Sequence, residues 1–301
     1  MSVALERRGA VAWLRVSNPP THLLRAHDLG ALRRHLVALE SDDEVRVVVL
    51  AGGPGCTPRQ LHPGDALAMA QAAPPYVPPR LVFAAVALLR RVPMLQRVVD
   101  RLPTPHVAFL DFLLCADVLE GSRLLSVAAL AGPVFGGGLE LALCCDLRVA
   151  SDADDTWLAQ PEALAGVMAG FGGTQRLPRL VGKARALQLL LLGDAVRPAE
   201  AERMGLVQQV VPAATLEEEV QAMAERLASR PTAAALGTHR AVHQGLQGTL
   251  ARGLAIELGA VQRVWARPEA REGLGKVSTL AGDPSLYELP LPELLHRFEH
   301  G

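Results

Sequence analysis

Residues 132–150 read GPVFGGGLELALCCDLRVA, and this stretch decides the fold. Three consecutive glycines lead into an apolar run that predicts a helix, and residues 147–150 predict a strand. Glycines at a helix start let the backbone approach a ligand, and the first helical amides have no intrahelical partner. The segment therefore suits an oxygen that becomes negative in a transition state. A tight strand–helix turn with a solvated Glu140 explains these residues equally well.

Outward from this segment, the hydrophobic pattern predicts an α/β core. Strands are predicted at 10–16, 45–51, 125–131 and 207–211, with helices at 27–40, 80–91 and 107–120. Prolines interrupt residues 54–79, which cannot form one continuous helix. The last third of the chain is mainly helical, with helices predicted at 183–192, 198–204, 215–229, 232–246 and 249–266. Repeated strand–helix units with a helical end are typical of an α/β protein.

The composition excludes several classes of protein. Half of the 301 residues are hydrophobic and 20% are charged, so a large core can form. The net charge of −1 argues against nucleic-acid binding. The four cysteines form no CxxC pair, which argues against a zinc site and predicts a reduced, cytoplasmic enzyme. The apolar stretch LVFAAVALL at 81–89 is too short to span a membrane.

Two carboxylates are candidate catalytic groups. Glu140 follows Gly138 by two residues, in the first turn of the predicted helix, and Glu162 follows Gln160-Pro161. Two carboxylates at one site can act as general base and general acid when their environments separate their pKa values. Spacing alone does not bring them together. Phosphate-loop and dinucleotide fingerprints are missing from the glycine run, which disfavours a nucleotide-binding module.

The chain resembles the crotonase (enoyl-CoA hydratase/isomerase) superfamily over roughly residues 3–60 and 124–277. The resemblance is carried by the stretches at 132–153, 159–194, 201–212 (AERMGLVQQVVP) and 267–274 (RPEAREGL). It implies a spiral of ββα units followed by a helical region that forms homotrimers, often stacked as hexamers. The expected organisation is a spiral core at 1–210 with an unusual insertion at 62–123, a helical oligomerisation or lid region at 211–280, and an irregular tail at 281–301.

The resemblance also implies a mechanism and its residues. The oxygen of an acyl-CoA thioester would accept hydrogen bonds from two backbone amides, Gly137 and Arg59, while Glu140 and Glu162 add water to a 2-enoyl-CoA in a syn sense. No metal or redox cofactor is expected, and coenzyme A enters as part of the substrate. The further residues expected to contact the substrate are Gly136, Gly138, Gln60, Leu61, Gly170 and Gly172.

Two segments depart from the family pattern. Thr57-Pro58-Arg59-Gln60-Leu61 stands where the family has Ala-Gly-Ala-Asp-Leu, and proline has no N–H to donate. The insertion at 62–123 carries apolar helices that suit a lid, an enlarged acyl pocket, core packing or a subunit contact; Asp111 and Glu120 within it are expected to be solvated. The alternatives to hydration are isomerisation, dehydration or decarboxylation of a CoA or carrier-protein thioester, and non-catalytic acyl-CoA binding.

Overall fold

The computed structural model describes residues 2–53, 56–72, 77–283, 286 and 288–300. By its internal contacts the chain divides into two compact units, Met1–Ala228 and Ser229–Gly301. The first unit thus extends past residue 210, where the sequence placed the end of the core, and includes the following helix α10 (Leu216–Ser229) almost completely.

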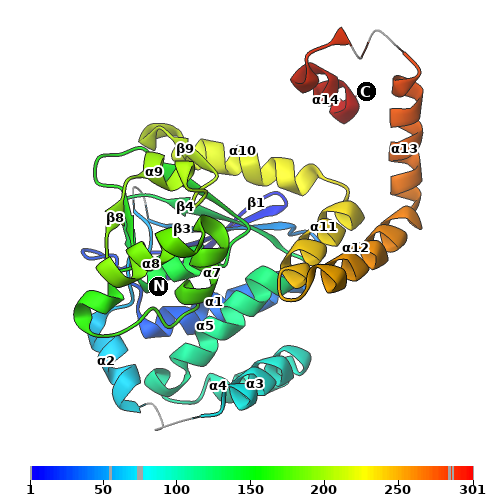
Figure 1. Cartoon of the computed structure of the whole chain (residues 1–301). Coiled ribbons are helices and arrows are strands. Elements are labelled where there is room, and N and C mark those ends of the chain that lie inside the picture. Colours follow the sequence, from blue (N-terminus) through cyan, green and yellow to red (C-terminus); the bar gives the residue numbers. More distant parts are fainter. Residues whose placement is uncertain (1, 54–55, 73–76, 284–285, 287, 301) are drawn as a thin grey trace. The chain divides into compact units, whose positions relative to one another are not determined.

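The first unit is built on a six-stranded sheet (Figure 1). Its order is β1 (Val3–Arg8), β2 (Val11–Val16), β3 (Val47–Gly52), β4 (Leu125–Leu130), β6 (Leu147–Ser151) and β9 (Gln209–Val211). β1 and β2 pair antiparallel, and every later pair is parallel. All six residues of β3 and of β4 are buried, which explains their continuous apolar sequences.

A second, three-stranded sheet joins β5 (Pro133–Phe135), β7 (Trp157–Ala159) and β8 (Ala195–Val196). β5 and β7 pair in parallel, with Phe135 opposite Ala159. This pairing matters for the site because each strand leads directly into a functional segment. β5 leads into the glycine run and α6 (Gly137–Ala142), and β7 leads into the short 3-10 helix η2 (Glu162–Ala165).

Helices α1 (Ala26–Glu40) and α5 (Thr104–Gly121) pack together on the main core. Leu29, Leu32 and Leu36 of α1 are fully buried, as the predicted helical spacing requires. Further helices of this unit are α7 (Gly173–Val181), α8 (Lys183–Leu192), α9 (Pro198–Arg203) and η3 (Ala213–Thr215). The predicted helices at 27–40, 107–120 and 183–192 are therefore confirmed, apart from a few terminal residues.

The insertion folds as short helices against α5. They are α2 (Pro63–Ala72), α3 (Pro79–Arg91), η1 (Pro93–Leu95) and α4 (Gln96–Val99), and α3 shares a small core with α5. The expectation that Asp111 is solvated is wrong. Asp111 is buried and accepts a hydrogen bond from Arg33 Nε at 2.7 Å, and the same guanidinium donates to Gln96 Oε1 at 2.8 Å and binds Asp100. This network ties α4 and α5 to α1.

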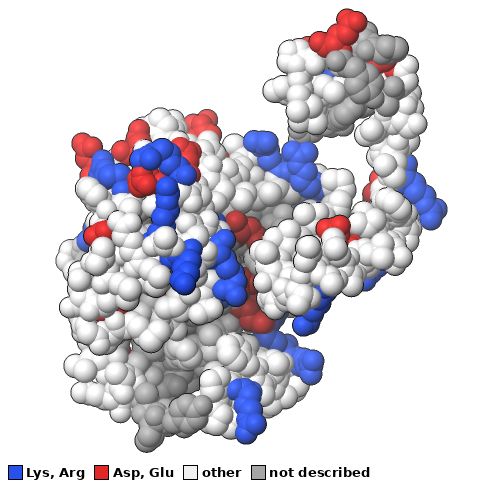
Figure 2. Space-filling model, in the orientation of Figure 1, with Lys and Arg blue, Asp and Glu red and all other residues white. Residues whose placement is uncertain are grey.

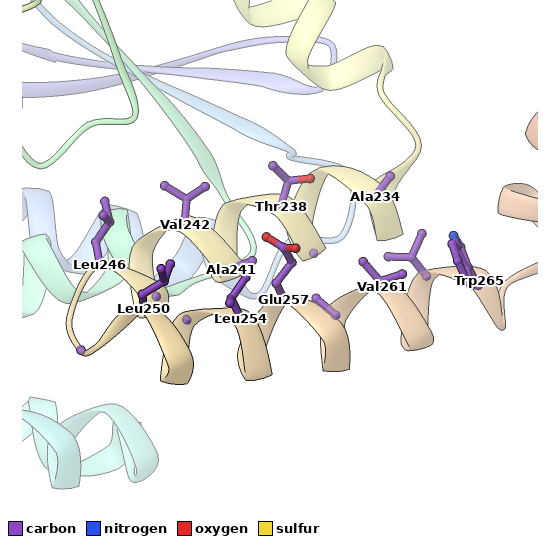
Figure 3. Close-up of a pocket in the computed structure, with 16 residues that line it drawn as sticks. Ala234, Thr238, Ala241, Val242, Leu246, Leu250, Leu254, Glu257, Val261 and Trp265 are labelled. Atoms are coloured by element: carbon purple, nitrogen blue, oxygen red, sulfur yellow. The ribbon is translucent and has the colours of Figure 1, made fainter.

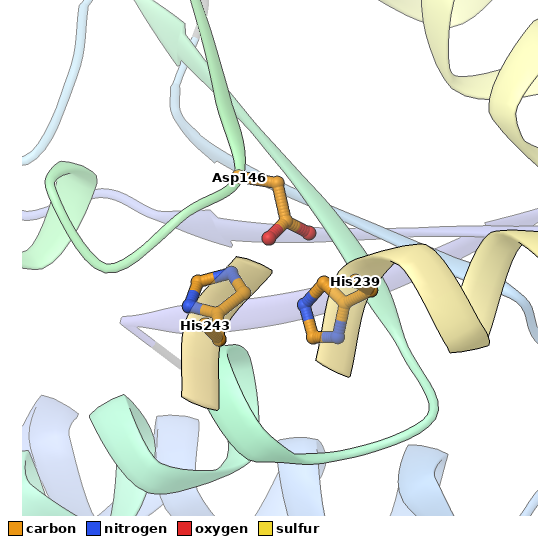
Figure 4. Close-up of side chains that lie close together, drawn as sticks. All are labelled: Asp146, His239 and His243. Carbon is orange, nitrogen blue, oxygen red and sulfur yellow. The ribbon is translucent and has the colours of Figure 1, made fainter. Parts of the chain in front are cut away.

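The second unit consists of α11 (Thr232–Gly245), α12 (Leu250–Trp265), α13 (Pro268–Ala281) and α14 (Leu291–His300). α14 occupies part of the tail at 281–301, where the expectation of irregular structure is wrong. On α11 the rings of His239 and His243 lie 4.4 Å apart, one helical turn from each other (Figure 4). Among the described residues, no helix is long and apolar enough to cross a membrane.

An apolar groove of about 720 Å³ runs between α11 and α12 (Figure 3). Leucines spaced four residues apart along α12 line or flank it and are exposed, as are one apolar residue of α11 and the residue that follows this helix; these are Leu250, Leu254, Leu258, Val242 and Leu246. Glu257 is the one charged side chain among the lining residues. A surface of this kind on a helix pair is typical of a protein interface.

Candidate active site

The glycine run lies directly against the loop at 57–61. A Cβ placed on Gly136 would lie 3.1 Å from Cβ of Gln60, and one placed on Gly137 would lie 3.5 Å from the Leu61 nitrogen. At Gly138 a Cβ would lie only 2.0 Å from the Arg59 carbonyl oxygen. Any side chain at this last position would collide with backbone, so the glycines permit the close approach of two loops. The structure therefore brings together six of the residues predicted from the sequence.

Glu140 sits on the first turn of α6 and is buried. Its Oε1 accepts hydrogen bonds from the backbone amides of Phe171 at 2.8 Å and Gly173 at 2.7 Å. Burial raises the pKa of Glu140 to about 7, against the opposing effect of the Gly173 amide and with a further increase from the charge of Glu162. A carboxyl group with a pKa near neutrality can both take up and release a proton at physiological pH.

Glu162 is the first residue of η2, and its side chain lies against the glycine run. Its Oε1 would lie 3.0 Å from a Cβ on Gly136. The Gln160 side-chain amide, oriented with its nitrogen towards the carboxylate, donates to Oε1 at 3.1 Å and to Oε2 at 3.0 Å. Burial also raises the pKa of Glu162. The two predicted carboxylates are thus close enough to interact electrostatically, although 22 positions separate them in sequence.

The loop that holds Glu140 is itself held by Arg176 on α7. Arg176 Nη1 donates to the Phe171 carbonyl at 3.0 Å, and Nη2 donates to Glu120 Oε2 of α5 at 3.0 Å. The expectation that Glu120 is solvated is therefore wrong, because it forms an ion pair with Arg176. The Phe171 ring stacks on Phe112 of α5, with centroids 4.3 Å apart. These contacts connect the insertion to the groups that orient Glu140.

The two predicted amide donors differ in their surroundings. Gly137 is the first residue of α6, where helical N–H groups have no intrahelical acceptor. The Arg59 amide instead donates to the carbonyl of His22 at 3.0 Å. The Gly137 amide is thus available at the helix start. The Arg59 amide would have to give up its hydrogen bond to the His22 carbonyl before it could donate to a ligand oxygen.

The remaining predicted residues lie at the edge of the site. Gly172 has φ +101° and precedes α7, and a Cβ there would lie 1.9 Å from Arg176 Nη1. Gly170 is exposed in the loop before it. The sequence reasoning missed Gln160, Arg176 and the amides of Phe171 and Gly173. Gln160 directly precedes Pro161-Glu162 and so could have been found. The other groups come close to Glu140 only when the chain folds, so no local sequence signal marks them.

Comparisons with known proteins identify the family of the chain. The sequence model of the enoyl-CoA hydratase/isomerase family matches residues 114–278. A probable enoyl-CoA hydratase of Rhizobium meliloti is 42% identical over 164 residues, 54% of this chain and 63% of the relative. A probable enoyl-CoA hydratase of Mycobacterium bovis is 37% identical over 187 residues, 62% of this chain and 68% of the relative. The chain thus spans about two thirds of the length of these relatives.

Solved structures give the same result for the fold. A Geobacillus kaustophilus structure described as enoyl-CoA hydratase subunit I aligns with a TM-score of 0.74 at 28% identity, covering 93% of this chain and 95% of that one. The enoyl-CoA hydratase of Bacillus anthracis aligns with a TM-score of 0.75 at 25% identity, covering 93% and 96%. The chain belongs to the enoyl-CoA hydratase/isomerase family and has the crotonase fold.

Proposed function

We propose that the protein is an enoyl-CoA hydratase that adds water, in a syn sense, to the double bond of a 2-enoyl-CoA thioester. The observation that supports this most is that the buried carboxylate of Glu140 and the half-buried carboxylate of Glu162 lie close enough to interact, with Glu162 directly against Gly136. Relatives named as probable enoyl-CoA hydratases or, in Syntrophomonas wolfei, as crotonyl-CoA hydratase support the same substrate class. We also propose that the protein acts in the cytoplasm.

Each group has a specific role in the proposed reaction. Attack of water on the β-carbon moves negative charge to the thioester oxygen, which the Gly137 amide and a loop amide would stabilise. One carboxylate accepts the proton of the attacking water, and the other protonates the α-carbon. The raised pKa values of Glu140 and Glu162 suit both transfers. By its chemistry this reaction needs no metal and no redox cofactor.

A second function, acyl-CoA binding without turnover, is favoured by one observation. The Arg59 amide is engaged by the His22 carbonyl, and the preceding Pro58 has no N–H. Loss of a single donor to a developing oxyanion typically lowers the rate by about 10²–10³. A chain with a permanently incomplete pair of donors would bind thioesters and convert them very slowly.

The test is a hydration assay on short, long and branched 2-enoyl-CoA esters, following the loss of conjugated thioester absorbance. We expect turnover by the wild type, and rates lower by about 10²–10⁴ in Glu140→Gln and in Glu162→Gln. The matched control is Glu218→Gln, because Glu218 is an exposed glutamate of α10. Binding of the esters without hydration would contradict the hydratase proposal, and conversion of 3-enoyl to 2-enoyl esters alone would identify an isomerase.

We also propose that the chain forms a homotrimer or a dimer of trimers. The exposed leucines along α12 and the groove of the second unit support self-association. Light scattering at micromolar concentration tests this. A mass of three or six chains is expected, reduced by Leu254→Glu, whereas a monomeric mass for the wild type contradicts it.

A further inference from the structure

The exposed side of α3 is almost entirely apolar. Between Arg80 and Arg91, the residues that face solvent are Leu81, Phe83, Ala84, Ala87 and Leu88. Leu81, Phe83 and Leu88 are 57%, 62% and 52% exposed, so they are not the edge of a core. The opposite side of the helix already has its core, where Val86 and Leu89 pack with Val99, Val107 and Leu114. α3 therefore has one apolar side packed in the core and a second apolar side exposed to solvent.

The same surface character continues through η1 and α4. Met94 is 73% exposed, Val98 53% and Leu102 49%. We call Leu81, Phe83, Leu88, Met94, Val98 and Leu102 the apolar patch. Six large apolar side chains so exposed within 22 residues go beyond the isolated surface hydrophobics that most proteins carry.

The patch is presented by a fixed platform. Arg90, on the inner side of α3, binds Glu40 of α1, with Nη2 to Oε1 at 2.7 Å, and Asp117 of α5 at 2.7 Å. Gln96 Nε2 of α4 donates to the Leu89 carbonyl at 3.1 Å. These contacts hold the outward orientation of the apolar side chains, so the patch is not produced by a detached helix.

The segment that carries the patch has an excess of positive charge. Residues 79–103 contain five arginines and a single acid, Asp100, which is already bound to Arg33 and Arg34. The four arginines other than Arg90 are exposed; they are Arg80, Arg91, Arg97 and Arg101. Figure 2 shows the surface over α3 as white with basic side chains at its margin. The chain as a whole is nearly neutral, so this positive charge is local.

This combination selects the class of partner. A helix with an outer apolar face and cationic residues at its borders binds at the interface of an anionic bilayer, with the apolar side chains among the acyl chains and the cations at headgroup level. The patch is the solvent face of a helix and not one of the grooves, which favours a fluid lipid surface over a peptide. We propose that α3, η1 and α4 form a membrane-docking site for anionic phospholipid surfaces.

The test uses the full chain and sucrose-loaded vesicles in a co-sedimentation assay. Vesicles of phosphatidylcholine and phosphatidylglycerol in equal parts should bind the wild type, and vesicles of phosphatidylcholine alone should bind it much less. Phe83→Glu should lower the partition coefficient at least about tenfold. It removes an aromatic side chain that would enter the bilayer, and it adds a negative charge that the anionic headgroups repel. Raising salt from about 0.1 M to about 1 M shortens the Debye length from about 10 Å to about 3 Å and should also weaken binding.

The matched control is Leu191→Glu on α8, which places the same charge on a leucine that is 64% exposed outside the patch. It should bind vesicles as the wild type does, and circular dichroism should show both variants folded. Equal binding by Phe83→Glu and Leu191→Glu, or no binding of the wild type to anionic vesicles, would overturn the proposal. If the wild type does not bind vesicles and Phe83→Glu has a different mass from the wild type in light scattering, the patch is a protein interface instead.

Discussion

The segment from the glycine run to α7 and the insertion at 62–123 satisfy their polar groups in opposite ways. In the first segment, backbone amides hold the Glu140 carboxylate and backbone carbonyls press against Gly138, so its polar groups converge on one small volume. In the insertion, the ion pairs of Arg33 and Arg90 lie on the side that packs against the core, and large apolar side chains face the solvent. The difference supports the two proposals made above, catalysis in the first segment and contact with another surface in the second.

The largest effect on stability is expected beneath the insertion. Arg33→Met leaves Asp111 buried without its cation, and breaking a buried ion pair typically costs about 3–5 kcal/mol. The side chain of Arg33 is 1% exposed, while that of its neighbour Arg34 is 55% exposed. Urea unfolding should therefore show a large loss of stability for Arg33→Met and about 0–1 kcal/mol for Arg34→Met. Equal losses would mean that the buried network does not hold the platform.

A pair of glycine substitutions compares the packing of the two segments directly. Gly138→Ala places a methyl group 2.0 Å from the Arg59 carbonyl oxygen, so the loop at 57–61 must move. We expect a loss of about 1–3 kcal/mol or more, together with lower hydration activity. Gly121→Ala, at the end of α5, meets no atom within 4 Å and should leave both quantities nearly unchanged. Thermal unfolding and the absorbance assay measure the two effects, and a benign Gly138→Ala would remove the argument for close approach.

The buried carboxylate should make stability depend on pH in a defined direction. The pKa of Glu140 is raised from 4.5 to about 7, so the folded state favours the protonated form. Below pH 4.5 both states hold the proton and the group has no effect; as the pH rises from 4.5 through 7 the wild type loses stability relative to Glu140→Gln, and the loss is complete above pH 7, on the order of 3 kcal/mol. Unfolding curves between pH 5 and about pH 8 test this. A difference that shrinks with rising pH would contradict the assigned environment.

The smallest expected effect concerns the rim of the apolar patch. Arg91→Gln removes one exposed cation beside Leu88 and should weaken binding to anionic vesicles about fivefold, since one basic residue near such a surface contributes about 1 kcal/mol. Its melting temperature should remain that of the wild type, because Arg91 is exposed. An unchanged vesicle affinity would indicate that the apolar side chains act without the arginines.

The sequence predicted the features that depend on local pattern. The buried strands and the helices α1, α5 and α8 follow from apolar spacing. The position of Glu140 in the first turn of α6 follows from the glycines before it. Features that depend on distant partners were not accessible. Asp111 and Glu120 were expected to be solvated because their cations, Arg33 and Arg176, lie 78 and 56 positions away. The acceptor of the Arg59 amide, likewise, is a carbonyl of another loop.

The measurement that tests the central claim most directly is label incorporation from solvent. The protein is incubated with crotonyl-CoA in deuterated, ¹⁸O-enriched water, and the product is analysed by mass spectrometry. The account predicts a 3-hydroxyacyl-CoA with one ¹⁸O on the β-carbon and one deuterium on the α-carbon, formed by the wild type and lost in Glu140→Gln and Glu162→Gln. Bound ester with no label incorporated, or deuterium without ¹⁸O, would contradict it.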